Sequence, residues 1–115
     1  MESLADRTKK FALRIIRLYV SLPKTTEAQV LGKQVLRSGT SVGAHYREAY
    51  RARSSSEFVS KLEGGMQELE ETVYWLELLS EAAIVPAEKL KPLQEEANTL
   101  MSILVTCAKN AKSKK

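Results

Sequence analysis

Four long segments of this chain repeat apolar residues every three or four positions, and no segment alternates apolar and polar residues as a half-buried strand does. In the first segment the apolar positions step by seven, four, three and four residues, which places them on one helix face: Leu4, Phe11, Ile15, Leu18 and Leu22. Pro23 ends this segment, because the residue before a proline is driven away from the α region. This periodicity predicts an all-α protein.

Start signals and short links divide the chain into four predicted helices, at about residues 3–22, 26–53, 55–83 and 87–110. Thr26 with Gln29 and Ser54 with Glu57 have the spacing of a capping box, which marks the start of a helix. Because the links are short, successive helices must be antiparallel neighbours. We therefore predict an antiparallel up-down-up-down four-helix bundle.

The middle of the second predicted helix, residues 38–44, consists mostly of small residues. Its two glycines each cost about 1 kcal/mol relative to alanine in a helix. Small side chains let two helix backbones approach closely, so we predict a tight helix crossing here, with a flexible hinge as the alternative. In the last helix, Pro92 either shifts the start or introduces a kink.

The chain has 115 residues, of which 43% are hydrophobic and 28% charged, a composition typical of one soluble domain. We therefore predict a single domain over residues 1–115. Its basic tail, residues 109–115, should be frayed. Cys107 is the only cysteine, so no internal disulfide can form, and its apolar-periodic position indicates packing. No apolar run approaches the ~18 residues that span a bilayer, and the acidic N-terminus excludes a secretory signal. We therefore expect no membrane contact and a cytoplasmic location.

Charge is polarised along the chain. Residues 1–53 carry eleven Lys or Arg against four acids, whereas residues 54–99 carry three against ten. Such asymmetry indicates either a polyanion that binds the basic half or attraction between the two halves. The candidate nucleic-acid-binding residues are Lys10, Arg14, Arg17, Arg37, Arg47, Arg51 and Arg53. Tyr46 and Tyr50 lie near these arginines, where they either stack on unpaired bases or pack against neighbouring helices.

The competing interpretation is a protein-interaction scaffold whose charges serve assembly. Basic positions on the first helix and acidic positions on the third repeat with matching spacing, so they could pair within one bundle or between subunits. These positions are Arg7, Lys10, Arg14 and Arg17 on the first helix, and Glu63, Glu70, Glu77 and Glu81 on the third. The second half of the third helix is apolar over more than one face, which indicates burial on more than one side. We therefore predict a homo-oligomer with Tyr74, Trp75 and Leu78 at its interface, with burial of Trp75 in the core of the monomer as the alternative.

No arrangement of residues in the chain supports catalysis or metal binding. A di-iron bundle needs Glu-x-x-His elements on facing helices, and His45 is the only histidine. His45 and Glu48 share a helix face, but two ligands do not close a metal site, so we predict a hydrogen bond on the helix surface or between helices. No other residue could serve as the base of a nucleophile, and no phosphate-binding loop is present. We expect no catalytic residue, no metal and no cofactor.

One long, ordered set of residues resembles a known family. It comprises residues 32–44 from Gly32 to Ala44, Glu48-Ala49, Ser56-Glu57-Phe58, Lys61-Leu62 and residues 71–79 from Glu71 to Leu79. In these residues the chain is similar, over nearly its whole length, to the bacterial four-helix-bundle proteins of the ribosomal RNA intervening-sequence family. It departs from the family pattern at His45, where the family commonly has Asn, and at Gly64-Gly65, where the family has a bulkier apolar pair. The second departure predicts looser packing in the middle of the third helix.

The resemblance implies a small, non-enzymatic bundle that assembles as a ring, a pentamer. It also implies kinship with the accessory proteins of diversity-generating retroelements, which bind nucleic acid and a reverse transcriptase. We therefore expect a ring-forming bundle that binds RNA or DNA through basic surfaces, as an accessory to a complex containing RNA or a reverse transcriptase. An oligomeric protein-interaction scaffold with no direct nucleic-acid binding is the alternative.

Overall fold

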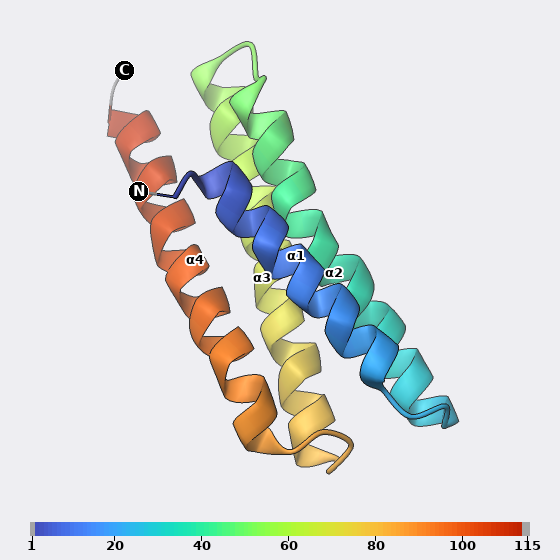
Figure 1. Ribbon diagram of the computed structural model, residues 1–115. Coiled ribbons are helices and arrows are strands. Elements are labelled where there is room, and N and C mark those ends of the chain that lie inside the picture. The colour runs from blue at the N-terminus through green and yellow to red at the C-terminus, as the bar shows by residue number, and fades with distance from the viewer. Residues whose placement is uncertain (1, 114–115) are drawn as a thin grey trace.

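A computed structural model describes residues 2–113, and within that range the chain forms four helices and no strand (Figure 1). The helices are α1 (Leu4–Ser21), α2 (Thr26–Tyr50), α3 (Ser55–Glu81) and α4 (Ala87–Ser113). Together they make an elongated antiparallel bundle with extents of 49 × 21 × 21 Å. The prediction of an all-α, up-down-up-down four-helix bundle is confirmed.

Hydroxyl side chains cap the start of the first three helices. The side chains of Ser3, Thr25 and Ser54 each accept a hydrogen bond from the backbone N–H three residues later. These bonds satisfy donors that have no partner in the first turn of a helix. The cap at Ser54, which accepts from the N–H of Glu57, agrees with the predicted start of α3. The cap of α2 is Thr25 rather than the predicted Thr26.

α2 ends at Tyr50 rather than at the predicted residue 53. The cause is the cap of the next helix, because Ser54 has an extended backbone with φ −148° and ψ 162° and the chain must leave the helical conformation before it. The N–H of Ala52 still bonds the carbonyl of Ala49 at 3.0 Å, which closes the last turn of α2. The link between α2 and α3 is therefore a tight turn.

α3 ends at Glu81, two residues before the predicted end, in a turn built on a left-handed residue. Ala83 has φ 59°, a conformation that costs a non-glycine residue about 1–2 kcal/mol. The N–H of Ala83 bonds the carbonyl of Ser80, and the N–H of Ile84 bonds the carbonyl of Leu79, each at 3.0 Å. These two bonds form a Schellman motif, which ends the helix without a glycine.

α4 begins directly after Pro86 and runs unbroken through Pro92. A proline has no backbone N–H and so removes one hydrogen bond from the helix that contains it. α4 nevertheless continues past Pro92 to Ser113. The predicted fraying of the basic tail is wrong for residues 109–113, which are helical. Residues 114–115 of that tail lie outside the described residues. α1 agrees with its predicted bounds to within one residue at each end.

Glycines bring α2 close against α1. A Cβ atom at Gly39 would lie 2.7 Å from Cγ1 of Ile15, and one at Gly32 would lie 2.6 Å from Cδ1 of Leu22. Both distances are far inside van der Waals contact. At Gly32 the end of the Leu22 side chain would have to move, whereas at Gly39 the close atoms include Cβ of Ile15 at 3.2 Å, so glycine is what lets the two helices approach there. Gly43 continues the same line along α2, which stays helical throughout. The small-residue stretch is thus the tight crossing that its composition predicts, and the hinge alternative is wrong.

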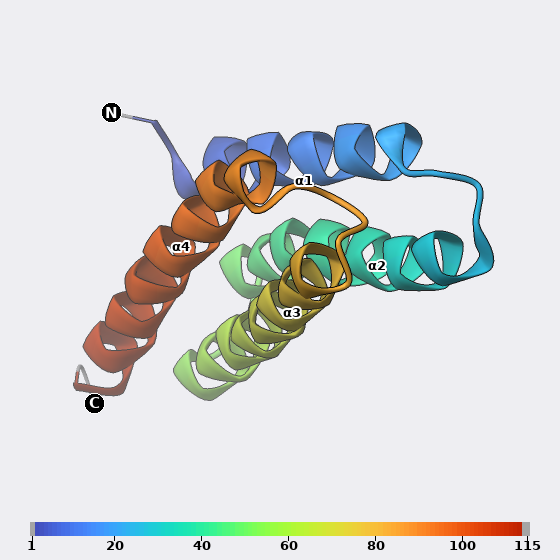
Figure 2. The same cartoon turned by 90° about the horizontal axis from the view of Figure 1, so that it is seen from below.

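The four helices enclose one apolar core. α2 packs against α1 and α3, α3 also packs against α4, and among neighbouring helices α1 and α4 have the least contact. Figure 2 shows the α1–α2 pair crossing the α3–α4 pair. The largest fully buried apolar side chains are Phe11, Ile15, Val35, Val42, Leu62, Leu69, Leu76, Leu79, Leu90, Leu100 and Leu104. Among the described residues, no helix has a stretch long and apolar enough to cross a bilayer.

Candidate nucleic-acid interface

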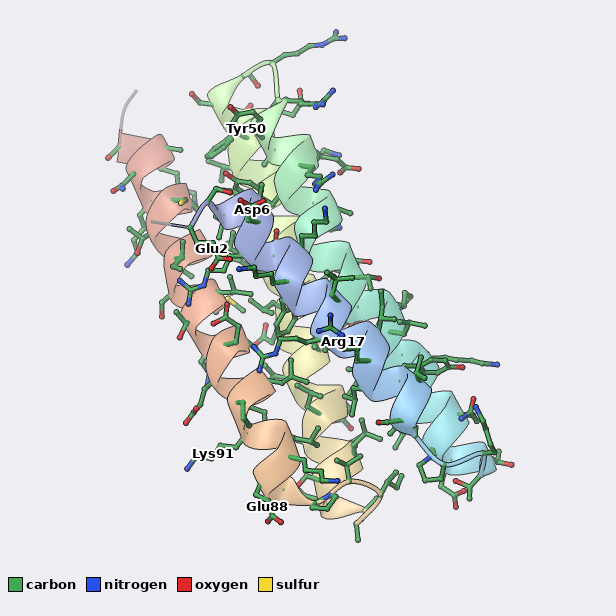
Figure 3. All side chains as sticks on the ribbon, in the orientation of Figure 1. Glu2, Asp6, Arg17, Tyr50, Glu88 and Lys91 are labelled. Carbon is green, nitrogen blue, oxygen red and sulfur yellow. The ribbon has the colours of Figure 1, made fainter. Side chains whose placement is uncertain are left out.

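The C-terminal end of α2 gathers exposed cations around an exposed aromatic ring. Arg47, Arg51 and Arg53, which we call the arginine cluster, are all exposed. Tyr50 lies among them and is 77% exposed. Its ring centroid is 6.5 Å from that of the partly buried Tyr46, which supports one side of it. Figure 3 shows Tyr50 at one end of the bundle, beside the turn between α2 and α3.

Within residues 2–113, no carboxylate forms an ion pair with the arginine cluster. In the part of the chain that the structure describes, ion pairs form on other cations, and none includes Arg47, Arg51 or Arg53. Glu48, which directly follows Arg47, contacts Lys61 of α3 at 3.3 Å instead. Three positive charges and one aromatic ring therefore remain open to an anionic partner at this end of the bundle.

A hollow between α1 and α2 extends the cationic surface onto α1. Its volume is about 250 Å³, and small side chains of both helices line it. Lys9 of α1 and Arg47 of α2 stand at its rim, so the first helix adds a cation to the arginine cluster. The hollow exists because Gly43 has no side chain, and a Cβ there would lie 3.1 Å from the hydroxyl oxygen of Thr8. Lys9 also has no ion pair among the described residues.

Arg14 and Arg17 lie in a different place from the arginine cluster. They line a hollow of about 360 Å³ between α1 and α4, together with Lys89 and the apolar Leu18 and Leu93. Figure 3 shows Arg17 partway along the bundle, well away from the Tyr50 end. The seven predicted nucleic-acid-binding residues therefore do not form one surface. Lys89, which lines the same hollow as Arg14 and Arg17, was not among the predicted residues. Lys89 lies there because α4 packs beside α1, and no local sequence pattern indicates that contact.

Arg37 and Lys10 are engaged by carboxylates of the same chain. Arg37 donates to Glu68 at 3.0 Å and to Glu71 at 2.6 Å, and these hydrogen bonds raise its pKa. The ammonium of Lys10 pairs with Glu2, which raises the pKa of Lys10. An anion would have to displace these carboxylates, so the two cations are less available than the arginine cluster.

The residues predicted for an oligomer interface lie on the second half of α3 and differ in exposure. Tyr74 is 52% exposed, whereas Trp75 and Leu78 are partly buried. The rings of Tyr74 and Trp75 have centroids 5.1 Å apart and planes tilted by 60°. The indole N–H of Trp75 is buried without a hydrogen-bond partner in the described bundle. Of the three, Tyr74 presents the most surface to a partner.

His45 lies between α2 and α3 in the space that a glycine leaves. A Cβ at Gly64 would be 2.8 Å from Nδ1 of His45. The imidazole thus takes the place of the side chain missing at Gly64, and α3 is helical throughout this stretch. Nδ1 of His45 lies 3.9 Å from Oε1 of Glu48, and Nε2 of His45 lies 3.8 Å from Oε2 of Glu68. Both distances are too long for the predicted hydrogen bond of His45. Within residues 2–113, no cluster of three potential metal ligands occurs.

The fold and the surface define a class: a small all-α bundle with an unneutralised cationic end. The sequence matches the family of 23S rRNA-intervening sequence proteins over residues 3–106. The chain belongs to that family. The predicted resemblance to the intervening-sequence proteins is thereby confirmed.

A solved structure resembles this chain in both sequence and fold. It is the crystal structure of a protein of unknown function from the S23 ribosomal protein family of Bacteroides thetaiotaomicron. The two chains are 36% identical, the match covers 93% of this chain and 99% of the other, and the TM-score is 0.88. No curated protein matches the chain.

Proposed function

We propose that this protein is a non-enzymatic, cytoplasmic bundle that binds RNA or DNA through the arginine cluster and forms a homo-oligomeric ring. One observation carries the proposal: Arg47, Arg51 and Arg53 are exposed, lack carboxylate partners within the described bundle, and flank an exposed Tyr50. The 23S rRNA in the name of the family makes RNA the first ligand to test.

The physical basis is charge neutralisation combined with stacking. Each phosphate that a cation neutralises releases condensed counterions, which is the main driving force for binding a nucleic acid. An exposed aromatic ring beside those cations can stack on an unpaired base, a contact worth about 1–3 kcal/mol. The sequence has no RNA-recognition, KH or zinc-finger signature, so binding should depend on charge and on unpaired regions rather than on base sequence.

Assembly into a ring would multiply a weak contact. If each protomer presents one arginine cluster, a nucleic acid that reaches several clusters binds more tightly than to any one of them, without further contacts. A pentamer is the assembly that the family resemblance implies. As an accessory to a complex with RNA or a reverse transcriptase, such a ring would hold nucleic acid without catalysing a reaction.

The test is fluorescence anisotropy on a structured RNA with unpaired loops and on a matched DNA, titrated across salt. The variant Arg47→Gln/Arg51→Gln/Arg53→Gln should lower the slope of log affinity against log salt by about 2–3, because up to three phosphate contacts are lost. The control Lys24→Gln/Lys33→Gln/Lys91→Gln removes the same charge from exposed positions outside the cluster and should change affinity much less. Equal losses in the two variants would show that binding follows net charge alone and would refute the assigned site.

The stacking role of Tyr50 can be tested separately from the charge of the arginine cluster. Tyr50→Ala should weaken binding to single-stranded RNA by about 1–3 kcal/mol and leave binding to a fully paired duplex nearly unchanged. An equal effect on both ligands would exclude stacking as the role of Tyr50. Far-ultraviolet circular dichroism should show the same helix content for each variant, since all the replaced side chains are exposed.

One observation favours a scaffold without nucleic-acid binding as the alternative. Three large apolar side chains on the outside of α1 are at least 40% exposed, which is typical of a surface that another protein covers. If wild-type protein fails to bind RNA or DNA at about 0.15 M salt, the scaffold becomes the better description, and the cationic end would then serve protein contacts.

A further inference from the structure

The outward face of α1 carries apolar side chains that the bundle does not cover. Leu13, Ile16 and Val20 are 41%, 40% and 69% exposed. They step by three and four residues, so they form one stripe along the helix. Lys9 and Arg17 share this face and have no ion pair among the described residues. We call these five residues the α1 strip.

The outward face of α3 has the opposite charge around an aromatic ring. Glu70, Tyr74, Glu77 and Glu81 step by four, three and four residues, and we call them the α3 strip. All four are exposed, Tyr74 to 52%. A shallow hollow lies beside the ring, lined by Gln67, Glu70, Glu71 and Tyr74. No cation within residues 2–113 forms an ion pair with the three glutamates of the strip.

The two strips cannot meet within one bundle. α1 neighbours α2 and α4, whereas α3 lies diagonally across the core with no Cα atom within 8 Å of α1, so the outward faces of α1 and α3 point away from each other. The ion pairs between helices join neighbours instead: Arg7 of α1 with Glu96 of α4, and Arg37 of α2 with Glu68 and Glu71 of α3. The charges of both strips are therefore left over after the fold is complete.

We propose that the α1 strip of one copy packs against the α3 strip of a second copy, an inference that rests on the proposed ring and names the surfaces that would build it. Each strip spans eleven residue steps, about 16 Å of helix, so the two have equal length. The apolar centre of the α1 strip faces Tyr74 and its hollow, and Lys9 and Arg17 face the glutamates. Apolar burial supplies the affinity, while the charges set the partner and the orientation.

Charge also decides against a symmetric contact. If two α1 strips met, four cations would lie together, and if two α3 strips met, six carboxylates would, and like charges in contact oppose association. A contact between unlike strips uses a different surface on each partner. Such a head-to-tail contact continues from copy to copy and closes into a ring when the rotation between copies allows it.

The experiment measures the mass of the full chain by sedimentation equilibrium over a range of protein concentrations. Lys9→Glu/Arg17→Glu and Glu70→Lys/Glu77→Lys each place like charges across the contact and should raise the dissociation concentration at least tenfold. The fourfold variant that carries both changes restores opposite charges and should recover most of the wild-type mass, whatever the number of subunits. The control Lys33→Glu/Lys91→Glu changes the same charge at exposed positions outside the strips and should keep the wild-type mass.

A second variant guards against an effect of charge alone. Ile16→Gln/Val20→Gln removes the exposed apolar surface, keeps the net charge and should also weaken association at least tenfold. Retention of the oligomer in this variant and in both charge-reversed variants would overturn the inference and leave the proposed ring intact. A wild-type chain that is monomeric at every concentration would refute the ring itself. If Lys9→Glu/Arg17→Glu lowers RNA affinity but leaves the mass unchanged, the α1 strip is a phosphate-binding surface and the inference is wrong.

Discussion

Replacing Gly39 with alanine should destabilise the bundle, although alanine is the better helix former. Gly39 lies at the crossing of α1 and α2, where a Cβ would sit 2.7 Å from Cγ1 and 2.9 Å from Cγ2 of Ile15. Ile15 is 0% exposed, and its β-branched side chain has one strongly preferred rotamer in a helix. The side chain therefore cannot turn away, and the two helices must move apart to admit the methyl group.

The expected magnitude follows from two opposing terms. The gain in helix propensity from glycine to alanine is about 1 kcal/mol. Overpacking a well-packed core costs about 1–3 kcal/mol, and the stiff, enclosed Ile15 places this site toward the upper end. We therefore expect Gly39→Ala to lower the free energy of unfolding by about 1–2 kcal/mol, measured by urea unfolding followed by circular dichroism.

Gly65→Ala is the matched control, because it makes the same substitution where the structure has room. A Cβ at Gly65 would lie 3.4 Å from Cβ of His45 and 3.6 Å from the carbonyl oxygen of Val42, which is near ordinary contact. The propensity gain then dominates, and the variant should be more stable than wild type by about 0.5–1 kcal/mol. If Gly39→Ala is as stable as Gly65→Ala, the close crossing of α1 and α2 is not what requires glycine, and the reasoning fails.

Two further changes test the turn after α3 and the contact of α1 with α4. Ala83→Gly should raise the free energy of unfolding by about 0.5–1 kcal/mol in urea unfolding, because glycine adopts the left-handed φ of 59° without the penalty of a side chain; an unchanged or lower stability would contradict this. The hydrogen bond from Arg7 lowers the pKa of Glu96, so ionised Glu96 stabilises the fold above its ordinary pKa and this contribution is lost as the pH falls through its lowered value. Glu96→Gln should therefore be less stable than wild type near pH 7, and the difference should shrink below about pH 4; a difference that does not change with pH would rule out this role.

The helices and their crossings were predictable because the signals that set them are local. Apolar residues at three- and four-residue spacing define α1 and place Phe11 and Ile15 in the core, as the structure finds. The small residues around Gly39 indicate a close approach, and the structure places them against α1. The ends of helices were less predictable, since the end of α2 depends on the cap of α3, and α3 ends at Ala83 without the glycine that usually marks such a turn.

The surface was harder to predict because ion pairs depend on which helices are neighbours. Arg37 and Arg47 are both exposed arginines of α2. Arg37 nevertheless bonds two carboxylates more than thirty positions away, whereas Arg47 has no carboxylate partner among the described residues. His45 and Gly64 differ from the family pattern as two separate positions in the sequence. In the structure they are one feature, because the imidazole fills the space that the glycine leaves.

The order of the helices decides which charges the fold uses and which it leaves for partners. In an up-down-up-down bundle each helix touches its neighbours in the cycle, so the basic repeat on α1 and the acidic repeat on α3 match in spacing but cannot pair. Arg7 of the basic repeat pairs with Glu96 of α4 instead, and Glu63 of the acidic repeat pairs with Lys112 of α4. The remaining members Arg17, Glu70, Glu77 and Glu81 stay exposed. The arginine cluster lies at the end of α2, and the two strips lie along the outward faces of α1 and α3. The two proposed surfaces therefore lie in different places on the protomer, although Lys9 borders both of them.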